Sequence, residues 1–298
     1  MDIKRLELLA DISETENLTI SAEHLGYTQS GVSHVIKKLE EELDITLLKR
    51  TNRGVALTEE AKILMPYVRS LIVQYNRFYE AADSIKGLQR GSITIGTYSS
   101  IAIRWLPVII KKFQTDYPNI SLQIREGGLE EIEEWMNAGM VDFGFISRIP
   151  HQKFEFITLN QEPLYAVLPK NFIVPPEFHG SFPVTAFADF PFITSESGVD
   201  NDVAATLQQA GIHPPVRFYC KDDHSIIAMV EHGLGITLLP SLILEGYDQN
   251  IVKIPLSVPA VRTLGIGMVS SDDLTTAARA FIAIARQTLK EMHPNPVL

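Results

Sequence analysis

Hydrophobic residues in the first 58 positions recur at helical spacing in three short segments. The first is an amphipathic helix with apolar residues at three-residue steps, at Ile3, Leu6, Leu9 and Ile12. A second short helix is predicted over 19–25, followed by Gly26, which can take the left-handed conformation that ends a helix tightly. A longer helix is predicted from its N-cap, Thr28, to about Leu43. Two helices joined by a three-residue turn that contains glycine form the helix-turn-helix layout.

The longer helix has two contrasting faces. At about 100° per residue, its apolar side chains form one stripe that must face a core: Val32, Val35, Ile36, Leu39 and Leu43. The opposite face is polar and carries Gln29, Ser30, Ser33, His34, Lys37 and Glu41. Glutamine reaches adenine, lysine reaches guanine or phosphate, and hydroxyls reach either. The polar face therefore fits a DNA recognition helix, although a simple solvated face has the same composition.

A basic hairpin is predicted directly after this helix. Two short apolar runs within 45–58 flank the turn Thr51-Asn52-Arg53-Gly54, in which asparagine and glycine tolerate positive φ. A basic hairpin beside a helix-turn-helix is a wing. We expect Arg50 and Arg53 to contact phosphates or a minor groove.

From Ala61 onward the apolar residues follow a heptad pattern, with alternating steps of three and four, at Ala61, Leu64, Val68, Leu71, Tyr75, Phe78, Ala82 and Ile85. This stripe is typical of a coiled coil. A helix over 61–88 would be about 42 Å long at ~1.5 Å per residue. We therefore predict dimerisation through Leu64, Val68, Leu71, Tyr75 and Phe78. Packing of this helix on its own domain is the alternative.

Beyond Gly91, short strands alternate with helices. Strands are predicted at 92–96, 120–124, 141–146, 192–194, 216–220, 235–239 and 264–269. Repeated β-α-β units predict parallel sheets with right-handed crossovers. We expect two such lobes, about 91–162 with 266–298 and about 163–265, so that the chain crosses between them after Leu159 and before Ile266.

Ligands of such sheets bind at the carboxyl ends of the strands, in the crevice between the two halves. The candidate residues there are Ser99, Ser100, Gly127, Gly128, Ser147, Arg148, Thr194, Ser195 and His224. Backbone amides at the start of the helix near Ile101 favour an anion, and the hydroxyls of Ser99 and Ser100 precede them. A small anionic or polar metabolite is therefore expected. Simple capping of the helix by these serines is the competing interpretation.

The charge balance does not indicate a nucleic-acid partner. The 298 residues include 26 Lys and Arg against 36 Asp and Glu, a net charge of −10. Residues 1–90 carry a net charge of −2, and the remainder carries −8. DNA binding must therefore come from a local arrangement of side chains.

Other chemistry finds little support in the sequence. The single cysteine, Cys220, excludes an intramolecular disulfide and favours a reducing cytoplasm. Cys220 and His224 lie close together, but a zinc site needs about four ligands and the sequence has no second cluster. It also has no nucleophile elbow and no phosphate-binding glycine loop. No apolar run reaches the ~20 residues of a membrane span, and the N-terminus has no apolar secretion segment. The sequence predicts no enzyme, metal, cofactor or membrane partner.

Several segments of the first 60 residues match a known pattern in order and spacing: AEHL at 22–25, QSGVS at 29–33, IKKLEEEL at 36–43, LLKR at 47–50 and LTE at 57–59. They resemble the winged helix-turn-helix of LysR-type transcriptional regulators. The resemblance implies a DNA-binding domain over 1–58 with its motif at about 18–37, a linker and dimerisation helix over 59–88, and an effector domain over 89–298. The expected fold is an all-α winged helix-turn-helix with a long linker helix, followed by an α/β domain of two Rossmann-like lobes similar to solute-binding proteins.

The resemblance also implies a function. The chain is expected to be a cytoplasmic regulator that binds an operator. The expected operator-binding residues are Thr28, Gln29, Ser30, Ser33, His34, Lys37, Arg50 and Arg53. The operator is double-stranded DNA, and a small-molecule effector would bind between the lobes. The family forms homodimers and commonly homotetramers, and RNA polymerase is a further candidate partner. Two alternatives stay open: a regulator with a vestigial pocket that is controlled by abundance, and a solute-binding α/β protein with an appended helical domain.

Overall fold

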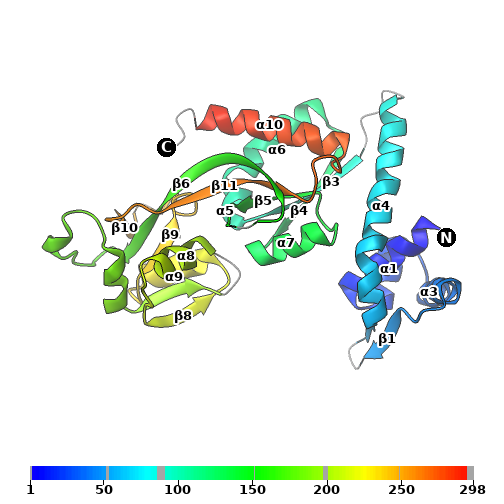
Figure 1. Cartoon of the computed structure of the whole chain (residues 1–298), viewed down its shortest axis with the longest axis horizontal. Helices are drawn as coiled ribbons and strands as arrows, with labels where there is room; N and C mark the ends of the chain where they lie inside the picture. The colour runs from blue at the N-terminus through cyan, green and yellow to red at the C-terminus, as the bar shows by residue number, and fades with distance from the viewer. Residues whose placement is uncertain are drawn as a thin grey trace. The chain divides into compact units, whose positions relative to one another are not determined.

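The computed structural model describes residues 2–51, 54–85, 91–150, 152–196, 201–247 and 249–293. The chain divides into two compact units (Figure 1). The N-terminal unit comprises Met1–Gly91 with Asn137–Met140, and the C-terminal unit comprises Ser92–Met136 with Val141–Leu298. Within the described ranges, no helix combines the length and apolar character that a membrane span requires.

Three helices at the start of the chain pack around one apolar core: α1 (Ile3–Thr15), α2 (Leu18–Leu25) and α3 (Gln29–Leu43). Their ends follow from local side-chain chemistry. The Asn17 side chain accepts hydrogen bonds from the first amides of α2, and Gly26 ends that helix at φ 71°. The Thr28 hydroxyl accepts from Gly31 N at 3.1 Å and so begins α3 where the sequence predicts.

The apolar stripe of α3 faces this core for most of its length. Val32, Ile36 and Leu39 are buried, and Val35 is partly buried against them. Leu43 was also expected to face the core, but 37% of it is exposed. It is the last residue of α3, and the chain turns away at Asp44, which has a φ of 53°.

The predicted wing is an antiparallel hairpin of β1 (Leu48–Thr51) and β2 (Gly54–Leu57). Glu40 Oε1 of α3 accepts hydrogen bonds from the amides of Leu47 at 2.6 Å and Leu48 at 3.2 Å. This carboxylate ties the hairpin to α3. The turn residue Arg53 lies outside the described residues.

The long helix α4 (Glu59–Ile85) divides the predicted heptad stripe in two. Val68 is buried in the core of the N-terminal unit, and Leu64 is partly buried against it. This part of the helix therefore packs on its own domain, which was the alternative interpretation. Leu71, Tyr75 and Phe78 are exposed, at 45%, 39% and 70%. Only this second half of the stripe is therefore open to a partner. Residues 86–88 of the predicted helix lie outside the described residues.

The C-terminal unit is built on a mixed sheet with the strand order β10-β6-β11-β5-β3-β4, and β9 also pairs with β6. Its strands are β3 (Gly91–Thr97), β4 (Ile120–Glu126), β5 (Phe143–Ser147), β6 (Glu155–Pro169), β9 (Thr237–Pro240), β10 (Ile251–Pro255) and β11 (Val261–Met268). A separate pair is formed by β7 (Phe192–Ser195) and β8 (Val216–Cys220). The helices are α5 (Ser99–Arg104), α6 (Leu106–Asp116), α7 (Leu129–Asn137), α8 (Asn201–Gln209), α9 (Asp223–Glu231) and α10 (Thr276–Met292), with short 3-10 turns η1 (Pro176–Phe178) and η2 (Val184–Asp189).

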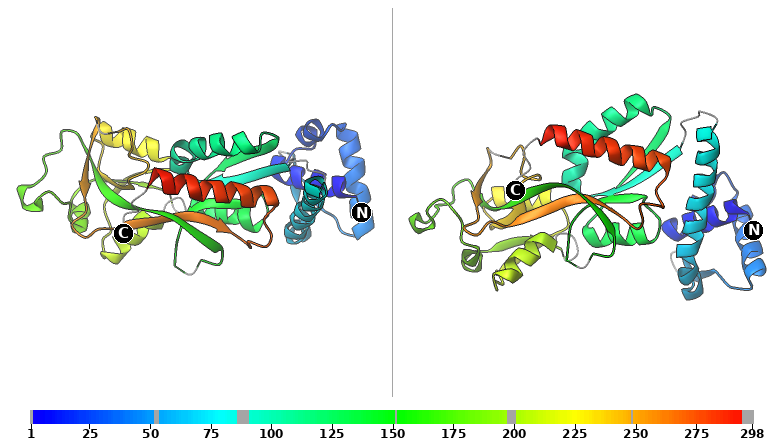
Figure 2. Two further views of the ribbon diagram at one scale, coloured as in Figure 1. Left: turned by 90° about the horizontal axis from the view of Figure 1, so that it is seen from above. Right: turned by 45° about the horizontal axis from the view of Figure 1, so that its top comes forward.

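The strand directions correct the prediction of purely parallel sheets. The pairs β3–β5 and β7–β8 are parallel, but β11 is antiparallel to β5 and β6, and β9 and β10 are antiparallel to β6. Figure 2 shows β6 and β11 running side by side through this unit. Along β6, Ile157 packs on the first lobe's core and Leu164 is buried in the second lobe's core. The two lobes are therefore joined by two long antiparallel strands.

Candidate functional site

The polar face of α3 is exposed at every position named in the sequence analysis. Gln29, Ser30, Ser33, His34 and Lys37 all lie on the surface of the N-terminal unit. Three hydroxyls there already have intramolecular partners, since Ser30 Oγ lies 3.3 Å from Thr28 Oγ1. The Thr28 hydroxyl caps α3, and Ser33 Oγ donates to the carbonyl oxygen of Gln29 at 3.2 Å. Gln29 and His34 are exposed on the same face.

The wing adds a basic group beside this face. Arg50 is exposed on β1 and has no ion-pair partner among the described residues, whereas Lys49 Nζ lies 3.8 Å from Glu59 Oε1. The hairpin is held close to α1, because Val55 N donates to the carbonyl oxygen of Glu16 at 3.0 Å. A Cβ at Gly54 would lie 2.4 Å from that oxygen, so only glycine fits this approach.

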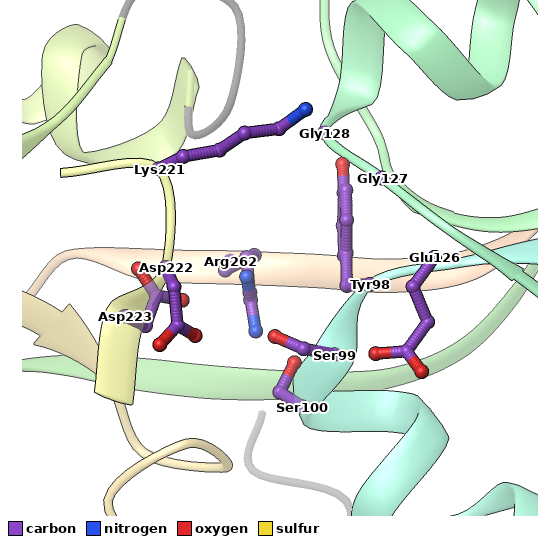
Figure 3. Close-up of a pocket in the computed structure, with 10 residues that line it drawn as sticks. All are labelled: Tyr98, Ser99, Ser100, Glu126, Gly127, Gly128, Lys221, Asp222, Asp223 and Arg262. Atoms are coloured by element: carbon purple, nitrogen blue, oxygen red, sulfur yellow. The ribbon is translucent and has the colours of Figure 1, made fainter. Parts of the chain in front are cut away.

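The C-terminal unit contains a cavity of about 300 Å³ between its two lobes (Figure 3). It is assembled from the ends of β3 and β4, the start of α9 and one residue of β11. The lining residues are Tyr98, Ser99, Ser100, Glu126, Gly127, Gly128, Lys221, Asp222, Asp223 and Arg262. We call this cavity the interlobe pocket.

Ser99 and Ser100 open helix α5 at the edge of this pocket. Figure 3 shows both hydroxyls directed toward the space in front of Arg262. The N-cap of α5 is Tyr98, whose side chain makes no capping hydrogen bond, so the serines do not serve as caps. The predicted helix breaks at Trp105 into α5 and α6, and α5 has only 6 residues. A helix this short has a small dipole, so the free amides at its start do not by themselves predict an anionic ligand.

A buried ion pair forms the back of the interlobe pocket. Arg262 of β11 donates to Glu162 Oε1 through Nε at 2.9 Å and through a terminal nitrogen at 2.6 Å. Glu162 Oε2 accepts from Ser241 Oγ at 3.0 Å and from Leu242 N at 2.6 Å. Both charged side chains are 5% exposed. The carboxylate is therefore satisfied on both oxygens, and it fixes the arginine that the ligand would meet.

Tyr98 belongs to the core of the first lobe and packs against this arginine. Its ring centroid is 5.6 Å from the Arg262 guanidinium carbon. Its hydroxyl lies 3.1 Å from Ser147 Oγ and accepts from Ser147 N at 3.2 Å. Burial raises the pKa of Tyr98 well above its ordinary value, so the phenol stays protonated. Ser147 thus supports the pocket through Tyr98 rather than lining it.

A second ion pair joins the two lobes at the side of the pocket. Lys221 Nζ lies 2.9 Å from Glu131 Oε1, and Glu131 Oε2 accepts from Gly128 N at 3.0 Å. The hydrogen bond from Gly128 and the pairing with Lys221 lower the pKa of Glu131, and the same pairing raises the pKa of Lys221. Glu131 is on α7 of the first lobe, and Lys221 follows β8 of the second.

The remaining predicted site residues lie elsewhere. Arg148 is exposed, with its guanidinium carbon 5.8 Å from the ring centroid of Phe156. Thr194 and Ser195 end β7 and are not among the described lining residues. His224 Nδ1 lies 2.6 Å from the Tyr247 hydroxyl, and His224 is not among the described lining residues. The pocket therefore brings together four of the predicted residues: Ser99, Ser100, Gly127 and Gly128.

Six lining residues are missing from the prediction: Tyr98, Glu126, Lys221, Asp222, Asp223 and Arg262. Tyr98 and Glu126 directly adjoin predicted residues, and 221–223 follow the predicted strand 216–220, so the strand-end rule could have included them. Asp222 also caps α9, accepting from Ser225 N at 3.1 Å. Arg262 had no such signal, because it is the second residue of β11 and the rule concerns the carboxyl ends of parallel strands.

Comparison with known proteins gives consistent results over the whole chain. Residues 3–62 match the family model described as "Bacterial regulatory helix-turn-helix protein, lysR family", and residues 86–290 match "LysR substrate binding domain". The transcriptional dual regulator GltC of Bacillus subtilis is 30% identical over 98% of this chain and 99% of its own length. Among solved structures, a full-length OxyR variant from Pseudomonas aeruginosa covers 97% of this chain and 95% of its own with a TM-score of 0.73 and 20% identity. CbnR in complex with its target DNA covers 97% and 100% with a TM-score of 0.66 and 18% identity.

Proposed function

This chain belongs to the LysR family of bacterial transcriptional regulators, and from that premise we propose how it binds its operator and what controls it. Residues 1–58 form the DNA-binding domain, 59–88 the linker segment that contains α4, and 89–298 the effector domain. A small polar metabolite in the interlobe pocket changes the affinity of the dimer for DNA. The observation that carries this proposal is the pair of serine hydroxyls directed into a pocket whose back wall is a fixed arginine.

Operator recognition uses the exposed face of α3 with the wing beside it. Gln29 and His34 contact base edges, and Arg50 contacts phosphate. The exposed second half of the α4 stripe, Leu71, Tyr75 and Phe78, supports a two-fold dimer. Such a dimer favours an inverted-repeat operator with half-sites about one helical turn, or a multiple of it, apart. Selection of genomic fragments by the full chain tests this, and an enriched inverted repeat is the expected result.

The charges around the interlobe pocket narrow the effector class. Glu126, Asp222 and Asp223 line it, while Arg262 and Lys221 are each held by a carboxylate. A purely anionic ligand would meet more negative than free positive charge at contact distance. A carboxylate that also carries amino or hydroxyl groups matches the mixture of serine hydroxyls, bases and acids. We therefore favour a polar metabolite of this kind.

Thermal-shift screening with matched ligand series tests the assignment. Each series contains an amino or hydroxy acid, the carboxylic acid that lacks the second group and the amine that lacks the carboxylate. We expect the bifunctional member to stabilise the native chain most, and Ser100→Ala to lose most of that response. Ser195→Ala is the matched control, because Ser195 is not among the described lining residues. No stabilisation by any series, or an unchanged response of Ser100→Ala, would reject the pocket and favour control by abundance.

A further inference from the structure

The segment 241–246 directly follows β9 of the second lobe, yet part of it packs on the first lobe. Its residue Leu242 is 5% exposed and belongs to the first lobe's core. The next two residues, Ile243 and Leu244, are instead buried in an apolar cluster of the second lobe that includes Ile227 of α9. This short stretch of chain therefore has side chains in both lobes, and it joins them in addition to the two long strands β6 and β11.

Glu162 of β6 binds the start of this segment. Its Oε2 accepts hydrogen bonds from Ser241 Oγ at 3.0 Å and from Leu242 N at 2.6 Å. Ser241 N in addition donates to the carbonyl oxygen of Pro163 at 3.0 Å. The other oxygen of the same carboxylate, Oε1, holds Arg262, which lines the interlobe pocket. One buried side chain thus contacts both the segment and a residue of the pocket.

Arg104 of the first lobe binds the end of the same segment. It is the last residue of α5, and its guanidinium donates to the carbonyl oxygen of Glu245. Arg104 Nε also lies 3.5 Å from Glu245 Oε2. Gly246 follows with a φ of 88°, and a Cβ there would lie 3.3 Å from a terminal nitrogen of Arg104. Helix α5 begins with Ser99 and Ser100, which line the interlobe pocket (Figure 3), so its two ends contact the pocket and the segment.

We infer that the segment 241–246 is a latch between the two lobes, and that Arg262 connects this latch to the interlobe pocket. A ligand carboxylate that binds Arg262 competes with Glu162 for the donors of the guanidinium. The hold of Glu162 on the segment then changes, and the latch opens more often when the pocket is occupied. By linkage, whatever opens the latch also changes the affinity of the pocket for its ligand. The control by a ligand rests on the proposed function of the pocket, whereas the latch itself requires no ligand.

The two ends of the latch differ in strength. Glu162 is buried, so its hydrogen bonds to the segment are shielded from water. The side chains of Arg104 and Glu245 are 32% and 53% exposed, and solvent weakens their attraction. The end at Arg104 should therefore open first, while the end at Glu162 responds to the pocket.

Hydrogen exchange of the full-length chain without ligand tests the latch, because the exchange rate of an amide reports local opening. The measured peptide covers 241–246. Arg104→Met removes the exposed contact and should speed exchange in this peptide about two- to fivefold. Lys112→Met is the matched control, because Lys112 also forms an exposed ion pair, with Glu291 of the same lobe, and should leave this peptide unchanged.

The connection to the pocket is tested with Arg262→Lys, which keeps the charge but cannot form the two hydrogen bonds of the guanidinium to Glu162. We expect exchange in 241–246 to become at least about fivefold faster. Lys221→Met removes a different cation from the lining of the same pocket and should not change this peptide. Ser241→Ala deletes only one hydrogen bond to Glu162 and should also speed exchange, so it decides the matter even if Arg262→Lys does not fold.

Three results would overturn the inference. The first is unchanged exchange of 241–246 in Arg104→Met, which would show that this contact does not hold the lobes together. The second is unchanged exchange in Arg262→Lys or in Ser241→Ala, which would disconnect the segment from the pocket. The third is an equal acceleration in β7 and β8, which would describe a general loss of stability instead of local opening. A failed effector screen leaves these results untouched, because no ligand is added.

Discussion

The exposed polar face of α3 and the interlobe pocket are built in different ways: the first comes from one continuous helix and the second from distant segments of the chain. On α3, the residues that face solvent alternate with those that hold the core, as with His34 beside Val32 and Ile36. The pocket instead draws on segments near 98, 126, 222 and 262. Its central base, Arg262, is itself a buried part of the fold.

In α3, different residues form the exposed face and the core. In the pocket, a single residue such as Arg262 takes part in both. A surface residue of α3 can change without disturbing the packing beneath it. In the pocket, Arg262 both lines the cavity and neutralises Glu162. A substitution can alter ligand specificity there without loss of stability at residues such as Ser99, which line the pocket but are not part of the buried core. Substitutions on the exposed face of α3 should therefore leave folding stability unchanged, whereas substitutions of Arg262 should lower it.

The largest effect is expected for Arg262→Ala. It leaves the Glu162 carboxylate buried without its cation, and breaking a buried pair in this way costs about 3–5 kcal/mol of folding free energy. Chemical denaturation of the full chain, followed through the tryptophans of the C-terminal unit, measures the loss. The control is the double variant Arg262→Met with Glu162→Gln, which removes both charges and should recover most of it. A loss below about 1 kcal/mol in the single variant would contradict the structural role of the pair.

The α3 comparison can be sharpened within one helix. Leu39→Ala empties a fully buried position and should cost about 2–5 kcal/mol. His34→Ala, on the exposed face, should change stability by less than about 0.5 kcal/mol. His34→Ala should instead relax the base preference found in operator selection. The folded fraction of Leu39→Ala should keep the base preference of the native chain. Equal destabilisation by both variants would show that recognition and packing are not separable here.

The N-terminal unit was predictable because its signals are local. The cap at Thr28, the turn at Gly26 and the apolar stripe of α3 each depend on neighbours a few residues away. The α4 stripe was predicted only in part. Heptad spacing identifies which residues share a face, but it cannot tell that Val68 packs inside its own unit while Leu71 stays exposed.

The C-terminal unit shows where local patterns stop. Strand ends carried the prediction of Ser99, Ser100, Gly127 and Gly128, because the carboxyl ends of parallel strands meet at one edge. The 15-residue strand β6 was not predicted as a strand, since apolar and polar residues do not alternate along it and Leu164 to Leu168 is an unbroken apolar run. Without β6 and its antiparallel partner β11, nothing in the sequence places Arg262 beside Glu162 or in the pocket.

Leu71→Asp on α4 tests whether the exposed half of the stripe is an interface. A charge in an apolar dimer seam should dissociate the dimer and lower operator affinity by at least about tenfold, because one half-site alone binds weakly. Light scattering and a DNA-binding titration give the two readouts. Ser70→Asp is the matched control, since Ser70 is exposed and does not belong to the stripe. An intact dimer of Leu71→Asp would place the main interface elsewhere.

A smaller effect is expected for Arg50→Ala in the wing. The loss of one phosphate contact should weaken binding to all sequences alike and lower the slope of log K against log salt by about one unit. Lys62→Ala is the control, because Lys62 Nζ lies 2.9 Å from Glu59 on α4 and is already paired. An altered base preference without a change in salt slope would instead assign Arg50 to a base edge.

The smallest effect should come from the pair Lys221–Glu131, whose side chains are 61% and 40% exposed and therefore well screened. Folding lowers the pKa of Glu131 from its ordinary value of 4.5, first through the Gly128 amide and then through Lys221. Its stabilisation is therefore present above that value and is lost as the pH falls through the lowered pKa. Lys221, whose pKa is raised, stabilises below its ordinary value of 10.5 and loses this as the pH rises through the raised pKa.

Glu131→Gln separates the two contributions, because a glutamine oxygen can still accept from Gly128 N but cannot pair with Lys221. We expect a slightly lower melting temperature for this variant near neutral pH. As the pH falls through the lowered pKa of Glu131, the native chain should lose its advantage and the two melting curves should converge. Added salt at neutral pH should narrow the gap in the same way, since the pair is exposed. A gap that persists at acid pH would mean that the carboxylate acts through packing, and that the two lobes do not depend on this charge pair.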